Sequence, residues 1–283
     1  MRFPAAAAPR AARGRTSLFV LLVLACAGAL VPPARAQQPG DMVTDRPDET
    51  ESPFAVAPGS VQIEMGWGYV NADRDGSERR THQVPGTLVR IGTVRGLEAR
   101  LGFAGWRHRQ VTSSTGTETR WGAGPLRLGA KYQFNQGHGM TPTVGLLGAL
   151  VLPTAAEGLG PSRVDPTFRV AAAHEASGVV GFGYNLGLRW LSVEAVTGET
   201  STEVEGIYSL AFGFALTRRL GAFAEAFGAL ALSDDAVSVA LLNTGLTFLA
   251  RRNLQFDAKV GIGLNREAEA WFVGAGFAWR VPR

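Results

Sequence analysis

The stretch VGFGYNLGLRW, residues 180–190, alternates without a break between two kinds of side chain. Every second position from Val180 to Trp190 is apolar or aromatic, and the positions between them carry glycine, Asn185 or Arg189. A period of two is that of a β-strand, in which successive side chains point to opposite faces. The stretch therefore predicts a strand with one apolar face and one small, polar face.

The same alternation recurs along most of the chain and predicts strands that are half buried. The twelve expected strands cover residues 61–70, 88–93, 97–103, 126–134, 143–152, 167–175, 180–190, 207–216, 221–230, 239–249, 254–264 and 270–280.

The expected connections alternate in length. Long ones cover residues 71–83, 107–123, 153–166, 192–203, 231–238 and 265–269, and short ones cover 94–96, 135–140, 176–178, 217–219 and 250–253. Long loops at one end and turns at the other are typical of outer-membrane barrels. We therefore predict an all-β fold, an antiparallel transmembrane β-barrel of about twelve strands.

The aromatic residues favour a membrane barrel over a soluble sandwich, whose strands would show the same alternation. If the first strand runs outward, five tryptophans are expected near the outer strand ends: Trp67, Trp106, Trp121, Trp190 and Trp271. Trp279 is expected at the inner end together with Tyr132 and Phe134. Such rings concentrate at membrane interfaces because they combine an apolar body with a polar tip.

Residues 1–36 are predicted to be a secretory signal peptide. Four arginines precede an apolar core from Leu18 to Leu30, which is too short to span a bilayer as a helix, and Ala34-Arg35-Ala36 offers a cleavage site. Cys26 lies in that core, so a lipoprotein cleavage site there is the alternative. Residues 37–58 would then form an N-terminal periplasmic or lumen segment, and residues 59–283 the barrel.

The charge of the chain depends on this leader. The whole chain carries 28 basic and 24 acidic side chains, but residues 1–36 hold five of the arginines and no acid. The remaining chain is close to neutral, so nothing favours nucleic acid as a partner. It also has no cysteine, which excludes disulfides and thiol chemistry.

The stretch TDRPDETESPFAVAPG, residues 44–59, is acidic, broken by three prolines and free of alternation. Together with Gln62 and Glu64, it resembles the N-terminal signature of the outer-membrane transporter family associated with the meta pathway of phenol degradation. Further similarity is found in LVLPT at 150–154 and AEAFG at 224–228. The resemblance implies passage of small, hydrophobic or aromatic compounds across the outer membrane.

Within residues 37–58, five side chains are candidates for a plug or gate: Asp45, Arg46, Pro47, Asp48 and Glu51. The prolines exclude a strand in the sheet. The segment is expected to enter the periplasmic mouth, where its charges pair with lumen charges such as Arg100 or Lys131, because an unpaired buried charge is costly. The alternative is a solvated tail that only spaces the barrel from the cleavage site.

The polar face of the expected strands carries the candidate lumen charges. They are Glu64, Glu98, Arg100, Arg127, Lys131, Arg189, Asp257 and Lys259, and Arg90 lies on the same face. One interpretation is structural: Glu98 with Arg100, and Asp257 with Lys259, neutralise one another and brace a narrow barrel. The other is a polar path in which charges set the preference for ions or solutes.

Catalysis is not expected. None of the four histidines, His82, His108, His138 and His174, has a serine two residues away on the same strand face, and their spacing does not suit a metal. The glycine-rich stretches lie inside strands with no helix after them, which excludes a phosphate loop. No cofactor and no metal site are predicted.

The expected function is therefore that of an outer-membrane channel for passive passage of small, hydrophobic or aromatic solutes. The alternative is a structural or surface-interaction barrel with a closed lumen. The expected partners are outer-membrane lipid, the solutes, and the outer-membrane assembly machinery, which would bind the C-terminal strand.

Overall fold

The computed structural model describes residues 42–74, 76–194, 199–233 and 236–281. The predicted signal peptide lies outside the described residues. The strands are β1 (Val61–Arg74), β2 (Ser77–Gly92), β3 (Leu97–Phe103), β4 (Trp106–Ser113), β5 (Gly116–Ala123), β6 (Leu126–Gln133), β7 (Thr143–Val151), β8 (Asp165–Glu175), β9 (Val180–Glu194), β10 (Thr200–Ala215), β11 (Leu220–Ala231), β12 (Val239–Arg251), β13 (Leu254–Gly263) and β14 (Trp271–Arg280).

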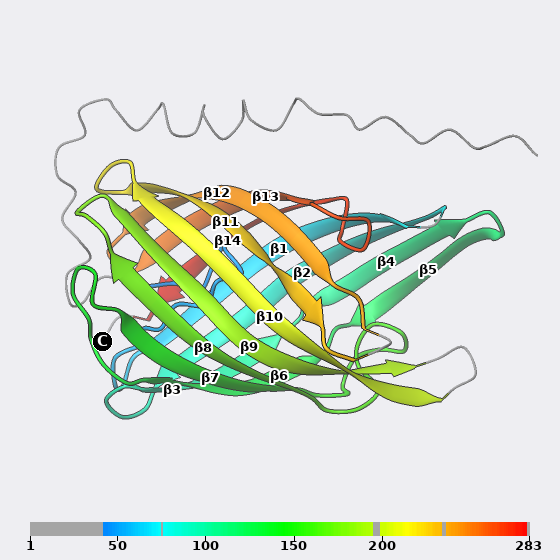
Figure 1. The fold of residues 1–283 in the computed structure, drawn as a ribbon, viewed down its shortest axis with the longest axis horizontal. Coiled ribbons are helices and arrows are strands. Elements are labelled where there is room, and N and C mark those ends of the chain that lie inside the picture. Colours follow the sequence, from blue (N-terminus) through cyan, green and yellow to red (C-terminus); the bar gives the residue numbers. More distant parts are fainter. Residues whose placement is uncertain (1–41, 75, 195–198, 234–235, 282–283) are drawn as a thin grey trace, which may run out of the picture. The chain divides into compact units, whose positions relative to one another are not determined.

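Neighbouring strands pair antiparallel around a closed sheet (Figure 1). β14 pairs with β1 from Gln62↔Arg280 to Asn71↔Trp271, and this pairing joins the two ends of the sheet. Closure leaves no open edge in the wall. The predicted antiparallel barrel of twelve strands is confirmed, with β4 and β5 as two additional strands.

β4 and β5 form a hairpin that continues β3 and β6 beyond the wall, at the right in Figure 1. β2 is long enough to pair with β3 through Thr87–Gly92 and with β4 through Glu78–Val84. The prediction that residues 71–83 and 107–123 are loops was therefore wrong. These stretches are polar on both faces, which suits a ribbon outside the bilayer, and the expected alternation applies only where one face meets lipid.

The two faces of the wall have opposite chemistry. Large apolar side chains are exposed on its outer face, including Leu101, Leu128, Val170, Leu186, Phe212, Leu246 and Val260. Charged and amide side chains are buried on its inner face, including Gln62, Glu64, Arg90, Glu98 and Lys131. In water the apolar side chains would be buried and the charged ones exposed. Apolar side chains on the outside and charged ones inside are stable where hydrocarbon surrounds the barrel and the lumen is polar.

The aromatic residues follow the predicted grouping only in part. Trp106 stacks on Trp121 with ring centroids 5.0 Å apart, where the hairpin leaves the wall. Tyr132 and Phe134 meet edge to face at the opposite end. Trp67, however, is the seventh of the fourteen residues of β1, so it lies at mid-strand and not at an outer end.

Candidate functional site

The N-terminal segment, residues 42–60, contains no strand and lies inside the barrel, where side chains of the wall bind its backbone. Backbone amides of the segment donate to Glu64, Glu98, Gln133, Asn185 and Glu225. Its carbonyl groups accept from Arg90 and Asn185. An irregular chain can be buried only if its peptide groups find such partners. The wall therefore supplies the hydrogen bonds that a ladder would otherwise give.

Asp45 is the centre of the most buried charge cluster. Its carboxylate accepts hydrogen bonds from the Lys131 ammonium at 2.8 and 2.9 Å and from the Arg100 guanidinium at 2.6 Å. The Arg90 guanidinium lies 3.3 Å away and also binds Glu64 and Glu98. Six side chains thus share three positive and three negative charges, and each charge has a partner, as burial requires.

Three further ion pairs join the segment to the wall. Arg46 binds Asp257 at 2.9 Å. Glu51 binds Arg100 at 2.6 Å, and the half-exposed Glu49 binds Lys259 at 2.6 Å. In the same segment, the Thr50 hydroxyl donates to Glu225 at 2.6 Å and lies 2.9 Å from the Ser209 hydroxyl. The contacts therefore reach β1, β2, β3, β6, β9, β10, β11 and β13, on all sides of the lumen.

The acids of the segment titrate in different directions. Burial alone would raise the pKa of Asp45, but Arg90, Lys131 and Arg100 outweigh it and hold the pKa well below its ordinary value. Burial, together with the nearby Glu225, raises the pKa of Asp48 well above its ordinary value. Lys259 lowers the pKa of Glu49. Asp45 is therefore held ionised, whereas Asp48 is easier to protonate than an ordinary aspartate.

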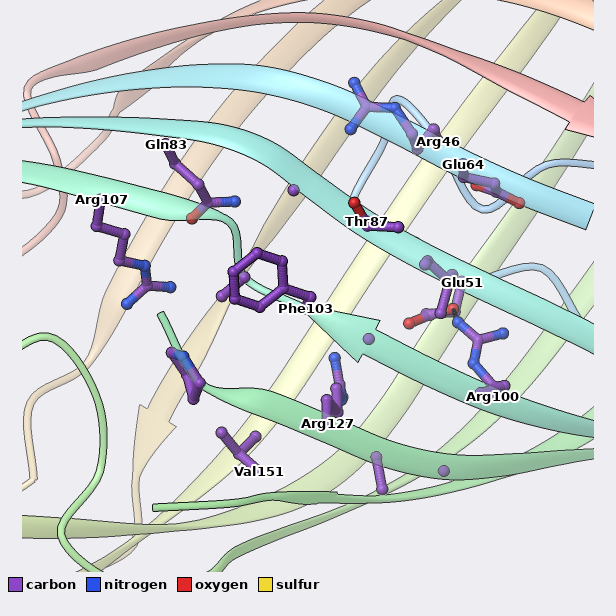
Figure 2. A pocket seen from close by; sticks show the side chains of 17 residues that line it. Arg46, Glu51, Glu64, Gln83, Thr87, Arg100, Phe103, Arg107, Arg127 and Val151 are labelled. Carbon is purple, nitrogen blue, oxygen red and sulfur yellow. Dashed lines mark hydrogen bonds and ion pairs between the residues drawn. The ribbon is translucent and has the colours of Figure 1, made fainter. Parts of the chain in front are cut away.

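Cavities lie on both sides of the segment. One, of about 370 Å³, is bounded by Arg46 and Glu51 of the segment and by wall residues toward the β4–β5 hairpin (Figure 2). We call it the outward cavity. The other, of about 410 Å³, is bounded by Thr44 and Asp48 and by residues 137–143 and 173–182 of the opposite end. We call it the turn-side cavity. Arg46 borders both.

The structure brings most of the candidate residues together, but not always in the expected pairs. Asp45, Glu51, Glu64, Glu98, Arg100 and Lys131 belong to one connected set of ion pairs and hydrogen bonds. Asp257 and Lys259, expected to neutralise one another, instead bind Arg46 and Glu49. Arg189 binds Glu205 of the neighbouring strand and not the segment.

Several residues that hold the segment were not among the candidates predicted from the sequence. Asn185, Ser209 and Glu225 were not predicted, and Arg90 was expected on the polar face without a role of its own, although each lies on the inner face of a predicted strand. The available signal was a polar side chain among glycines and alanines, as in AEAFG. That signal marks the inner face but does not say which residues bind the segment.

Among the residues that the structure describes, the histidines do not form a site with acidic or sulfur ligands. His82 and His108 face each other across β2 and β4 with ring centroids 6.3 Å apart, and His174 stacks on Phe182. Within the described ranges, no group of three or more His, Cys, Asp or Glu side chains could hold a metal ion. In the same residues, no helix is long and apolar enough to cross a membrane.

A closed antiparallel barrel with an apolar outside and a charged, occupied lumen defines an outer-membrane β-barrel protein. Residues 44–281 match the family described as "Putative MetA-pathway of phenol degradation", and the chain belongs to that family. The match includes the N-terminal segment from Thr44 onward, as the sequence resemblance implied. Comparison with curated proteins gives no match.

Solved structures share the fold at low sequence identity. The COG4313 outer membrane channel from Pseudomonas putida F1 is 13% identical, with a TM-score of 0.64 over 80% of this chain and 97% of that one. The translocator domain of the autotransporter NalP from Neisseria meningitidis is 11% identical, with a TM-score of 0.53 over 80% and 90%. The NanC porin is 8% identical, with a TM-score of 0.52 over 78% and 100%. These similarities show the fold alone.

Proposed function

We propose that the protein is an outer-membrane channel for passive passage of small, hydrophobic or aromatic compounds, and that its N-terminal segment controls the lumen. The observation that carries the proposal is the cavity on each side of a segment held by ion pairs. A barrel of twelve strands is wider than the roughly eight-stranded size that side chains alone fill, and is near the size that side chains and a plug together can still close. Open space on both sides of a separate segment is what a route for solutes requires, whereas a packed interior would leave no such space.

The family description supports the choice of solute, and a solved structure with the same fold supports a channel. The family is named for phenol degradation, and one solved structure that shares the fold, with a TM-score of 0.64, is an outer membrane channel. The outward cavity combines Leu88, Phe103 and Val151 with charged side chains. Apolar walls with a few polar groups are typical of sites for small organic molecules.

In this proposal the plug consists of Asp45, Arg46, Pro47, Asp48 and Glu51. Their partners Glu64, Glu98, Arg100, Lys131, Asp257 and Lys259 form its seat in the wall. Because the Glu49 side chain is half exposed whereas Asp45 is buried, the segment would loosen near Glu49 before the Asp45 cluster separates. Local opening of this kind uses the contacts of lowest free energy.

We further propose that the C-terminal strand is the segment through which the assembly machinery inserts the barrel. β14 presents Trp279 on the outer face near its end and completes the wall by pairing with β1. Arg280, the last residue of the predicted strand 270–280, pairs with Gln62 and is the final residue of β14.

Uptake by intact cells tests the proposed function. A labelled aromatic solute is supplied at low concentration to diderm cells that express the chain and to matched cells without it, and initial accumulation is measured. Faster accumulation with the protein is expected. Equal rates, with the protein assembled in the outer membrane, would contradict transport and favour the structural or surface-interaction barrel.

A further inference from the structure

The outward cavity carries more positive than negative charge. Its lining includes four arginines, Arg46, Arg100, Arg107 and Arg127, but only two acids, Glu51 and Glu64. Both acids are already engaged, Glu51 with Arg100 at 2.6 Å and Glu64 with Arg90 at 3.0 Å. The cavity therefore presents positive charge toward anything that enters it.

The arginines differ in how well they are neutralised. Arg46 and Arg100 each bind carboxylates directly. Arg127 makes no ion pair within 4.0 Å in the described part of the chain, and Glu51 acts on it only at longer range. Arg107 donates from its terminal nitrogen to the Leu159 carbonyl at 2.8 Å, and its buried Nε finds no acceptor in the described part of the chain.

A buried guanidinium group without an acceptor is costly, and a carboxylate can bind it through two parallel hydrogen bonds. Such a partner is missing for Arg127 and for Arg107 Nε among the described residues. Figure 2 draws Arg107 on one side of the Phe103 ring and Arg127 on the other. A ligand with a negative group and a flat apolar body would bind the guanidinium groups through the first and contact the Phe103 ring through the second.

Apolar side chains provide the rest of the cavity. Leu88, Phe103, Pro125 and Val151 line it beside the arginines, and its volume of about 370 Å³ suits a molecule of one or two rings. Inorganic anions would reach the arginines but leave these apolar surfaces in water. The combination distinguishes an amphipathic anion from both a simple ion and a neutral hydrocarbon.

We propose that the outward cavity is a binding site for small organic anions with an apolar body, such as aromatic carboxylates, and that Arg127 is their principal anchor with Arg107 as the second. The inference rests on the proposed function, since it names the class of solute that the channel receives. The carboxylate displaces water from the guanidinium groups, and the ring contacts Phe103 and Val151.

Equilibrium binding of a solute to the purified chain without its predicted leader (residues 37–283, the mature chain), in detergent, tests this site without requiring the solute to cross a membrane. Benzoate is the anionic probe and benzamide its neutral counterpart, and calorimetry gives both dissociation constants. Benzoate is expected to bind at least about tenfold more tightly than benzamide, because charge-assisted hydrogen bonds are available only to the anion. The preference should weaken as salt is added.

Two variants locate the site. Arg127→Gln is expected to weaken benzoate binding about tenfold and to leave benzamide binding unchanged. Arg95→Gln changes an arginine in the exposed turn between β2 and β3 and is expected to leave both unchanged. β-Sheet circular dichroism and heat-modifiable electrophoretic mobility verify that each variant folds.

The outcomes separate this inference from the proposed function. Equal binding of benzoate and benzamide, or no effect of Arg127→Gln, would overturn the anion site even if cells take up neutral aromatics. Equal competition by inorganic phosphate would reduce it to a general anion site and would also overturn it. Specific benzoate binding in a protein that does not speed uptake would retain the site but contradict the channel.

Discussion

Asp45 shows at the scale of one residue why the segment stays inside the barrel. Its side chain is 2% exposed and faces Lys131, which is 0% exposed, so both charges have left water. Their attraction offsets that loss only while every partner is present. Removing one member of such a set costs more than removing the whole set.

The variant Asp45→Asn is expected to destabilise docking of the segment by about 3–5 kcal/mol, because three buried cations would lose their shared carboxylate. Denaturant unfolding in detergent measures the change. Glu49→Gln is the matched control, since the Glu49–Lys259 pair is half exposed on the acid side and its loss should cost about 1 kcal/mol or less. Equal effects of the two variants would contradict a central role for Asp45.

Asp48 predicts a pH dependence of docking. Its pKa is raised in the docked state, so ionisation of Asp48 opposes docking, and docking strengthens as pH falls from neutral through the raised pKa. Asp45 has the opposite sign: its pKa is lowered, and its contribution is lost only as pH falls below the ordinary value of 3.8. Channel openings should therefore become rarer on mild acidification, between neutral pH and about that value.

Asp48→Asn removes the contribution of Asp48 to this pH dependence and leaves that of Asp45. The variant is expected to open less often than the natural chain at neutral pH and to respond less to mild acid, since its amide cannot ionise. Open probability in planar bilayers, recorded over a pH series for both proteins, provides the measurement. Because Glu225 is present in both, the difference isolates Asp48, and identical pH profiles would argue against it.

At the scale of the elements, the segment and the wall are built on different rules. The strands satisfy their peptide groups through the closed ladder, whereas the segment depends on side chains such as Asn185 and Glu225. Most contacts of its backbone between Val43 and Val56 therefore depend on the rotamers of wall side chains, whereas Gly59 and Ser60 bond to the backbone of Gly92. An element of this kind can be released without unfolding the barrel.

A disulfide can fix the segment in place. Thr50→Cys with Ser209→Cys joins two positions whose hydroxyl oxygens lie 2.9 Å apart, and the only natural cysteine, Cys26, is in the predicted leader. The oxidised double variant is expected to give no openings, and reduction should restore the behaviour of the natural chain. Each single variant serves as the control. Unchanged conductance in the oxidised form would mean that passage does not require the segment to move.

The strands and the segment were not equally predictable from the sequence. Residues 180–190 identify a strand because lipid on one face and lumen on the other enforce a period of two. The β4–β5 hairpin was missed because neither of its faces must be apolar outside the bilayer. Pairing of Arg46 with Asp257 could not be read from the sequence, since the two are 211 positions apart and their contact depends on where the chain crosses the lumen.

At the scale of the whole molecule, the barrel combines a fixed wall with a removable interior. Deleting residues 37–58 would remove Asp45 and Glu51 but leave Arg90, Arg100, Lys131, Glu64 and Glu98 on the wall, so the lumen would become more positive. The shortened barrel is therefore expected to conduct and to prefer anions over cations. Reversal potentials in a salt gradient measure that preference, and cation preference would show that the charge distribution has been misjudged.

The most direct measurement is single-channel conductance of the refolded mature chain in planar bilayers, recorded beside the same chain without residues 37–58. We expect the intact barrel to be closed most of the time and the shortened barrel to conduct continuously. Silence of both, with each correctly folded, would mean that the wall side chains close the lumen themselves. That result would contradict a channel controlled by its N-terminal segment.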